Sequence, residues 1–125
     1  MLQKLLLLSA AGACGTLSRF ALCELASKAK NCPLPLGTFS VNILGSFLFG
    51  LIYVLAGKKL HISGDIRLIV LTGFMGAFTT FSTFAFETAQ MLGAAQWAAA
   101  LGNIFAQITL GIAALAIGVL LGRML

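Results

Sequence analysis

Charged side chains are scarce in this sequence. Of its 125 residues only 9% are Asp, Glu, Lys or Arg, and three of these are acidic. Soluble globular domains carry about 25% charged residues and about 45–50% apolar ones, whereas this chain is 60% hydrophobic with a mean hydropathy of +1.06. So little polar surface cannot cover the outside of a chain this small. The shortage of charge therefore excludes a soluble globular domain and predicts that lipid surrounds most of the protein.

Catalytic and metal-ligating side chains are equally few. Histidine occurs once, as His61, and the three cysteines, Cys14, Cys23 and Cys32, lack the CxxC spacing of a metal site. An odd number of cysteines argues against a fully paired disulfide framework, and we expect them to pack as small residues between helices. The sequence has no nucleophile motif and no nucleotide-binding loop, so no enzyme is predicted.

What the sequence does contain is four long hydrophobic stretches, at about residues 2–26, 36–56, 66–92 and 97–121. Each is close to the ~20 residues that a helix needs to cross a bilayer core. Short polar links join them, and no internal repeat is present. We therefore expect a single all-α integral membrane domain of four transmembrane helices over residues 1–125.

The first stretch also has some features of a signal peptide, because Lys4 precedes the run LLLLSAAGAC. The apolar character continues past Cys14, however, through LSRFALCELA. We therefore interpret residues 2–26 as an uncleaved first membrane helix.

The net charge of +5 comes from basic residues at the edges of the apolar runs. No basic cluster with interleaved aromatic residues occurs, so we expect contacts with lipid headgroups and none with nucleic acid. Four spans place both termini on one side of the membrane. That side holds Lys4, Lys58, Lys59, Arg67 and Arg123, while the other holds Lys28 and Lys30. The difference favours cytoplasmic termini, but it is modest, and a chain with so small a bias can insert in both orientations.

The third stretch has an unusual composition for a membrane helix. It contains GFMGAFTTFSTF, in which Gly73 and Gly76 precede a run of Thr, Ser and Phe. The pattern predicts a helix broken near residues 76–79, which is tolerated only where the backbone faces protein, water or an ion. Carbonyl groups left unpaired at such a break can bind a cation such as Na+. Ordered water or a neighbouring hydroxyl would satisfy them equally well.

The aromatic and the polar residues of this segment each recur at a helical spacing. Residues three or four apart share a face of a continuous helix. The aromatic set is Phe78, Phe81 and Phe84, and the polar set is Thr79, Thr83 and Glu87. The edge of a phenyl ring is partially positive, so it can replace part of the hydration of a small anion without holding it tightly. The alternative is a packing face of phenylalanines, with the hydroxyls bonded back to backbone carbonyls.

Polar side chains at membrane depth are costly and therefore indicate function. Asn42, in SVNILGSF, offers the amide hydrogens that a hard anion needs, and Asn103 and Gln107 add amides in the fourth stretch. Each of them is equally suited to an interhelical hydrogen bond. Arg19 either attracts anions into a vestibule or extends toward the headgroups.

Two segments together resemble the small bacterial Fluc fluoride channels: GTFSVNILGSFLFG at residues 37–50 and GFMGAFTTFSTF at residues 73–84. GTLSRF at residues 15–20 and the glycine-spaced fourth stretch agree in order and position, so the resemblance covers essentially the whole chain. It implies a fluoride-selective ion channel of the bacterial inner membrane, through which cytoplasmic fluoride leaves passively. It further implies an antiparallel homodimer of dual topology, with two pores and a structural Na+ at its centre.

The resemblance also implies roles for individual residues in the fluoride path. The residues of this path are Asn42, Phe81, Phe84, Thr38, Thr83, Glu87 and Arg19. The ring edges of Phe81 and Phe84 and the amide of Asn42 would contact the ion, while Thr83 and Glu87 would form a polar track toward one vestibule.

For the structural Na+, the resemblance implies ligation by the backbone carbonyls of Gly76 and Thr79 from both subunits. Asn103 and Gln107 depart from the family, which often shows Tyr and Ser at their positions. This departure leaves the contribution of the fourth helix to the pore open.

A small multidrug-type proton-coupled transporter is the alternative, because it is also an antiparallel dimer of four-helix chains. Such a transporter is expected to place an essential carboxylate in the middle of its first helix, whereas Glu24 lies near the end of that stretch beside Arg19. A membrane anchor without transport activity is a second alternative, but it needs neither an asparagine at membrane depth nor a broken helix.

Overall fold

The computed structural model describes residues 1–28, 34–59 and 62–125. Lys30, Cys32 and His61 lie outside the described residues, as do the side chains of Lys58 and Lys59. Every element within the described ranges is helical.

Four helical spans in the described chain are long and apolar enough to cross a membrane. The first span is α1 (Leu2–Ser27), and the second is α2 (Leu36–Val54), which the π-helix η1 (Leu55–Lys59) extends. The third span comprises α3 (Gly64–Leu68), the π-helix η2 (Ile69–Met75), α4 (Gly76–Phe78) and α5 (Phe81–Gly93). The fourth span is α6 (Trp97–Met124). The prediction of an all-α chain with four membrane helices is confirmed.

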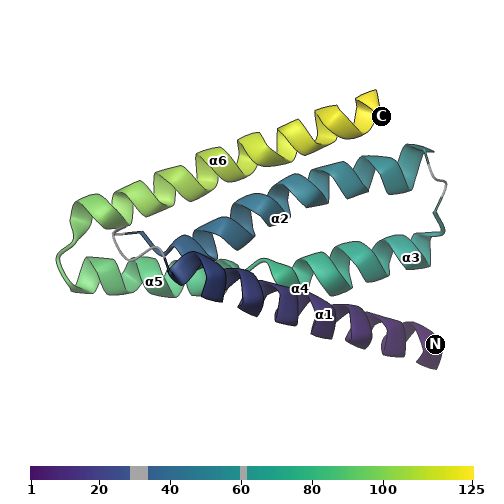
Figure 1. Ribbon diagram of the computed structural model, residues 1–125, viewed down its shortest axis with the longest axis horizontal. Coiled ribbons are helices and arrows are strands. Elements are labelled where there is room, and N and C mark those ends of the chain that lie inside the picture. The colour runs from purple at the N-terminus through teal and green to yellow at the C-terminus, as the bar shows by residue number, and fades with distance from the viewer. Residues whose placement is uncertain (29–33, 60–61) are drawn as a thin grey trace.

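The spans form two closely packed pairs. Helix α2 runs alongside α6, and α1 runs alongside η2 and α4 (Figure 1). Both termini lie at the end of the molecule where α2 connects to α3, and the α5–α6 turn forms the opposite end (Figure 1). An ion pair between Lys4 Nζ and Asp65 Oδ1 (2.6 Å) joins the start of α1 to α3. The side on which the termini lie in the cell stays a prediction.

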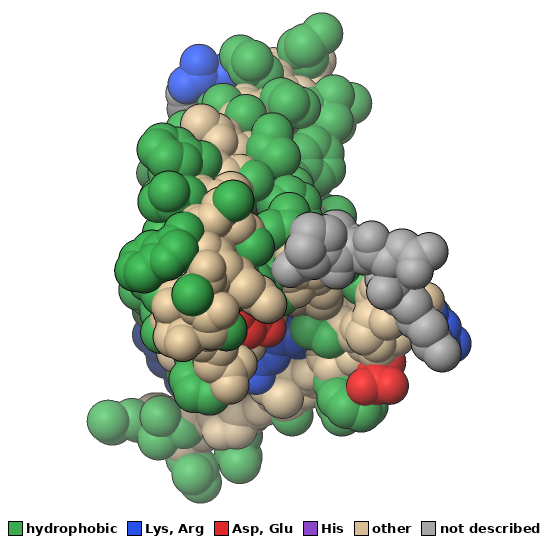
Figure 2. All heavy atoms as spheres, turned by 90° about the vertical axis from the view of Figure 1, so that its left-hand side faces the viewer, with side chains coloured by type: hydrophobic (Ala, Val, Ile, Leu, Met, Phe, Trp, Pro, Cys, Tyr) green, Lys and Arg blue, Asp and Glu red, His purple; other side chains and the backbone are tan. Residues whose placement is uncertain are grey.

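The buried core is small, and most large apolar side chains face outward. Its central cluster consists of Val41, Met75 and Phe78. Apolar side chains cover much of the surface (Figure 2), and the exposed ones include Leu6, Phe105 and Ile112. Lipid solvates such a surface without the free-energy cost that water would impose, so this distribution is what a membrane protein requires.

Glycines bring the backbones of α2 and α6 into direct contact. A Cβ atom at Gly50 would collide with the carbonyl oxygen of Leu115, and one at Gly118 would collide with the carbonyl oxygen of Phe47. Gly122 has Val54 Cβ only 3.0 Å from where its own Cβ would be. Close approach at small residues supplies the van der Waals contact that holds membrane helices together.

The pair formed by α1 and η2 is also held together by close contacts at glycines. A Cβ atom at Gly15 would collide with the carbonyl oxygen of Phe74, and one at Gly73 would lie 3.0 Å from Ala11 Cβ. Gly76 has an ordinary helical conformation, with φ −64° and ψ −33°. The glycines of the third span therefore lie within helical turns, where Gly73 permits close packing.

The third span leaves the helical conformation at Thr79 and Thr80. Their dihedral angles, φ −88° and ψ 160° for Thr79 and φ −150° and ψ 111° for Thr80, are those of extended backbone. The hydroxyl of Thr80 then accepts a hydrogen bond from Thr83 N–H (3.2 Å) and so caps the start of α5. Gly45 of α2 makes room for this segment, because a Cβ atom there would collide with Thr79 Cγ2.

We predict that Gly118→Ala destabilises the protein, because the added methyl group pushes α6 away from the backbone of α2. Overpacking of this kind costs about 1–3 kcal/mol, which thermal unfolding of the detergent-solubilised protein would report as a lower midpoint. Gly102→Ala is the matched control, because it lies on the same helix and nothing lies within 4 Å of its added Cβ. Equal midpoints for the two variants would contradict the glycine contact.

We also predict that Ala95→Gly stabilises the α5–α6 turn. Ala95 has a positive φ of 58°, a conformation that costs a residue with a Cβ atom roughly 1–2 kcal/mol and glycine almost nothing. The same thermal measurement should show a midpoint a few degrees above that of the unmodified chain. Ala94→Gly serves as the control, because Ala94 has φ −85° and has no such strain to relieve.

Candidate functional site

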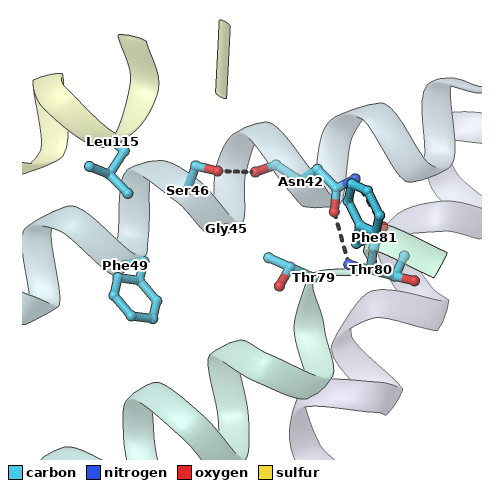
Figure 3. A pocket seen from close by; sticks show the side chains of 8 residues that line it. All are labelled: Asn42, Gly45, Ser46, Phe49, Thr79, Thr80, Phe81 and Leu115. Carbon is cyan, nitrogen blue, oxygen red and sulfur yellow. Dashed lines mark hydrogen bonds between the residues drawn. The ribbon is translucent and has the colours of Figure 1, made fainter. Parts of the chain in front are cut away.

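The side chain of Asn42 holds the backbone of Thr80 across the space between α2 and the third span. Asn42 Oδ1 accepts a hydrogen bond from Thr80 N–H (2.9 Å; Figure 3). Asn42 Nδ2 donates to the Thr80 carbonyl (3.2 Å). In a continuous helix the Thr80 N–H would donate to the carbonyl of Gly76, four residues earlier. The carboxamide therefore replaces the helical hydrogen bond at the point where the chain becomes extended.

An open cavity of about 350 Å³ lies beside this contact. It is lined by Asn42, Gly45, Ser46, Phe49, Thr79, Thr80, Phe81 and Leu115 (Figure 3). Phe81 is 78% exposed, so its ring is free to contact an ion or a second protein chain. The cavity thus combines an amide, three hydroxyl-bearing residues and an accessible aromatic ring.

The predicted aromatic face is divided by the extended segment. Phe81 and Phe84 lie together on α5, with ring centroids 5.6 Å apart and ring planes inclined by 57°. Phe78 belongs to α4, is buried in the core and stacks on Phe74 with a centroid distance of 6.0 Å. The expectation that Phe78 shares a face with Phe81 and Phe84 is therefore wrong, because the helix does not continue through Thr79 and Thr80.

The predicted polar set is divided in the same way. Thr79 lies before α5, and its hydroxyl donates back to the Met75 carbonyl (3.1 Å). Thr83 and Glu87 remain one turn apart on α5 and therefore share a face. The hydroxyl of Thr83 lies 2.9 Å from the hydroxyl of Thr80, so it is linked to the extended segment as well.

A second cavity, of about 550 Å³, opens where α1 ends and α2 begins. Thr38, Thr83 and Glu87 line it, and the buried hydroxyl of Thr38 donates to Glu87 Oε1 (2.8 Å). Glu87 Oε2 has no hydrogen-bond partner among the described residues. Viewed from this end, acidic and basic side chains lie in a hollow of the surface (Figure 2). This cavity has the character of a polar vestibule.

Arg19 lies on α1 four residues before Cys23, which lines the vestibule, so the two side chains share a face of the helix. Its side chain is half-buried, whereas Glu24 is exposed. These two residues form no ion pair in the part of the chain that the structure describes. Arg19 is therefore placed on the face of α1 that leads to the vestibule.

The carbonyls of residues 76–79 lose their helical donors at the extended segment, because the helix stops at Phe78 and starts again at Phe81. For two of them the lost donor has a new partner. The N–H of Thr80, which would donate to the Gly76 carbonyl, donates to Asn42 Oδ1. The N–H of Thr83, which would donate to the Thr79 carbonyl, donates to the Thr80 hydroxyl. Among the described residues no group of three or more His, Cys, Asp or Glu side chains is placed to hold a metal ion. Backbone carbonyls of this kind can bind a hard monovalent cation, and those of Gly76 and Thr79 are two of the four.

Asn103 and Gln107 form a hydrogen-bonded chain that the sequence did not reveal. Gln107 Oε1 accepts from Asn42 Nδ2 (2.7 Å), and Gln107 Nε2 donates to Asn103 Oδ1 (3.0 Å). Asn103 Nδ2 donates to the hydroxyl of Thr88 (3.0 Å), which donates to the Phe84 carbonyl (2.8 Å). The four-residue spacing of the two α6 amides indicated a shared face, but no feature of the sequence pointed to Thr88.

Comparison with known proteins identifies the family. Residues 6–119 match the family described as "CrcB-like protein, Camphor Resistance (CrcB)". A protein of Nitrosococcus oceani named "Fluoride-specific ion channel FluC" is 52% identical over 118 residues, which cover 94% of each chain. Proteins with the same name are 46% identical over the full length of both chains in Solidesulfovibrio magneticus, and 43% identical over 123 residues in Nitratidesulfovibrio vulgaris.

These relatives match from end to end, and the four spans of the described chain agree with a multi-pass bacterial membrane protein. Neither the family nor the site indicates an enzyme. The chain belongs to the CrcB-like protein family.

Proposed function

We propose that this protein is a fluoride-selective channel of the bacterial inner membrane that exports cytoplasmic fluoride passively. The observation that carries this proposal is the name shared by its relatives, "Fluoride-specific ion channel FluC", at identities up to 52% over nearly the whole chain. The cavity beside Asn42 and Phe81 and the vestibule around Glu87 support it, because they combine groups suited to a small hard anion.

The rings of Phe81 and Phe84 would contact fluoride through their edges. A ring edge offers partial positive charge without a full cation, so binding is strong enough for entry and weak enough for release. The exposed ring of Phe81 and the buried ring of Phe84 support successive contacts along a path from the open cavity into the protein.

Asn42 would add a hydrogen-bond donor to this path. Both hydrogens of its Nδ2 already donate, to the Thr80 carbonyl at 3.2 Å and to Gln107 Oε1 at 2.7 Å. The longer bond is the weaker one, so a passing anion would most easily replace the Thr80 carbonyl as acceptor. In this way Asn42 would donate to fluoride without releasing Gln107.

A polar track would lead from the rings toward the vestibule. The hydroxyls of Thr83 and Thr38 would donate to the anion, and Thr38 would leave Glu87 Oε1 to do so. Arg19 would raise the local concentration of anions at the mouth of the track, because a cationic side chain attracts them from solution.

The direction of transport would follow from proton chemistry outside the protein. Hydrogen fluoride crosses membranes as a neutral acid and ionises in the less acidic cytoplasm, where the anion is trapped. A channel then lets fluoride leave down its electrochemical gradient, so neither ATP nor a redox cofactor is needed, and the cell is protected from fluoride toxicity.

We further propose an antiparallel homodimer of dual topology with a structural Na+ at its centre. Insertion in both orientations is supported by the small difference in basic residues between the two sides. The exposed ring of Phe81 beside an open cavity supports a surface that a second copy covers. The carbonyls of Gly76 and Thr79, freed from helical bonding, would hold the ion from both subunits.

The multidrug-type transporter is not favoured. Its mechanism requires a carboxylate in the middle of the first span, and the only acidic residue of α1, Glu24, is exposed near the end of that helix. Glu87 lies on α5 and is bonded to Thr38, in a site that has no part in such a mechanism.

We predict that liposomes containing the purified protein lose fluoride rapidly and retain chloride. Phe81→Ile and Asn42→Ala should each slow fluoride loss by about tenfold or more, the factor that about 1.4 kcal/mol of lost stabilisation produces. A fluoride electrode and a potassium shunt supply the measurement.

Phe105→Ile is the matched control for this flux measurement, because Phe105 is an exposed ring on α6 away from both cavities. No fluoride loss from well-folded unmodified protein would overturn the proposed function. Equal rates of fluoride loss from liposomes with the Phe105→Ile and Phe81→Ile variants would show that Phe81 has no role in the path.

We also predict that Leu125→Cys, in a chain whose own three cysteines are replaced, is labelled in part by an impermeant thiol reagent in intact cells. Dual topology requires that a comparable further fraction is labelled only after the cells are opened, because those molecules have their C-terminus inside. Labelling from a single side would contradict the antiparallel dimer and leave the channel function to be judged by flux alone.

A further inference from the structure

The chain of side-chain hydrogen bonds from Asn42 to Thr88 has a single possible polarity, meaning that only one assignment of donors and acceptors satisfies every bond. It starts at the backbone N–H of Thr80, which can only donate. The acceptor opposite it must be Asn42 Oδ1, and this places Asn42 Nδ2 toward α6. The backbone of the extended segment therefore decides which way the carboxamide of Asn42 faces.

The same order of donor and acceptor then continues along α6. Because Asn42 presents a donor, Gln107 must present Oε1 to it and Nε2 to Asn103. Asn103 must then accept with Oδ1 and donate with Nδ2 to the hydroxyl of Thr88. That hydroxyl donates its own proton to the Phe84 carbonyl within α5. Each amide orientation follows from its neighbour, so turning one amide over would break the bonds on both sides of it.

These amides are buried, so water cannot replace a hydrogen bond that one of them loses. Asn103 is 0% exposed, Thr88 6% and Gln107 8%. In a membrane interior no bulk water is available to satisfy an amide that has lost its partner. The orientation of Asn42 is therefore coupled to residues that contact neither the open cavity nor the vestibule.

We propose that Gln107 and Asn103 are positioning residues that hold the carboxamide of Asn42 with its oxygen on the Thr80 N–H. In this role they fix the extended step at Thr79 and Thr80 and thereby the place where Phe81 begins α5. The proposal depends on the proposed function only for its flux measurement, because the orientation of Asn42 is also observable in the backbone of Thr80.

A purely structural role would join α5 to α6 without regard to the polarity of the amides. The two roles differ in what they require at position 103. Positioning requires an acceptor toward Gln107 and a group that bonds to the hydroxyl of Thr88, whereas simple packing requires only a side chain of similar volume.

Four single variants separate these roles. Gln107→Met keeps the length of the side chain and removes both polar atoms, and Asn103→Leu removes the next amide. Asn103→Asp keeps the required polarity when the measurement is made at a pH at which the new carboxyl is protonated, because it then accepts through its carbonyl and donates through its hydroxyl. Thr109→Val is the control on α6, because the exposed Thr109 bonds only to its own helix at the Phe105 carbonyl.

The first measurement is hydrogen–deuterium exchange of the Thr80 amide in the purified full-length protein. We expect Gln107→Met to accelerate this exchange by about tenfold or more, because Asn42 is then free to turn away. Asn103→Leu should act in the same direction, and Asn103→Asp and Thr109→Val should stay within about threefold of the unmodified protein. The amides in the middle of α6 should keep their protection in all four variants.

Fluoride efflux from liposomes is the second measurement. The variants in which the Thr80 amide exchanges faster should show slower fluoride efflux, in the same rank order. Unchanged exchange at Thr80 in folded Gln107→Met protein would overturn the proposal. Equal effects of Asn103→Asp and Asn103→Leu, or faster exchange throughout α5 and α6, would assign these residues a packing role instead. If the unmodified protein moves no fluoride, the proposed function fails, while the exchange data still decide the positioning role.

Discussion

One hydrogen bond determines most of the site: the bond from the Thr80 N–H to Asn42 Oδ1. A backbone N–H inside a membrane must have a partner within the protein, and the helical partner of this one would be the Gly76 carbonyl. Because Asn42 supplies the acceptor, the third span can leave the helix at Thr79 without an unsatisfied donor. The hydroxyl of Thr80 then caps α5 and directs Phe81 into the cavity.

That bond forms only because the helices approach closely. Gly45 lets the Thr79 segment lie against α2, which brings Asn42 within reach of Thr80. Gly50 and Gly118 bring α6 against α2, which brings Gln107 within reach of Asn42. Small residues therefore do more than hold the spans together, since they set the distances at which the polar side chains meet. The same close contacts leave the large apolar side chains facing outward, where lipid can solvate them.

In the proposed channel the anion path and the cation site have a common origin. At the extended segment, backbone N–H groups donate to side-chain oxygens in place of backbone carbonyls. Each N–H that a side-chain oxygen takes up leaves a carbonyl without its helical donor, first at Gly76 and then at Thr79. A single local departure from helix geometry thus leaves backbone carbonyls without helical donors next to the residue where Phe81 begins α5. The amides of α6 stabilise this departure from a distance, through Gln107.

Composition and hydrophobic length alone determined the membrane environment and the four helical spans, and short motifs carried the resemblance to the family, because all of these are properties of contiguous residues. They also indicated Asn42, Phe81 and Phe84 as residues of interest. Periodicity failed at Phe78, since it assumes a continuous helix, and the interruption at Thr79 and Thr80 depends on an acceptor from another span. The pairing of Asn42 with Thr80 and with Gln107 joins residues 38 and 65 positions apart. Only the tertiary structure decided these pairings, because they require the glycine contacts that bring three separate spans together.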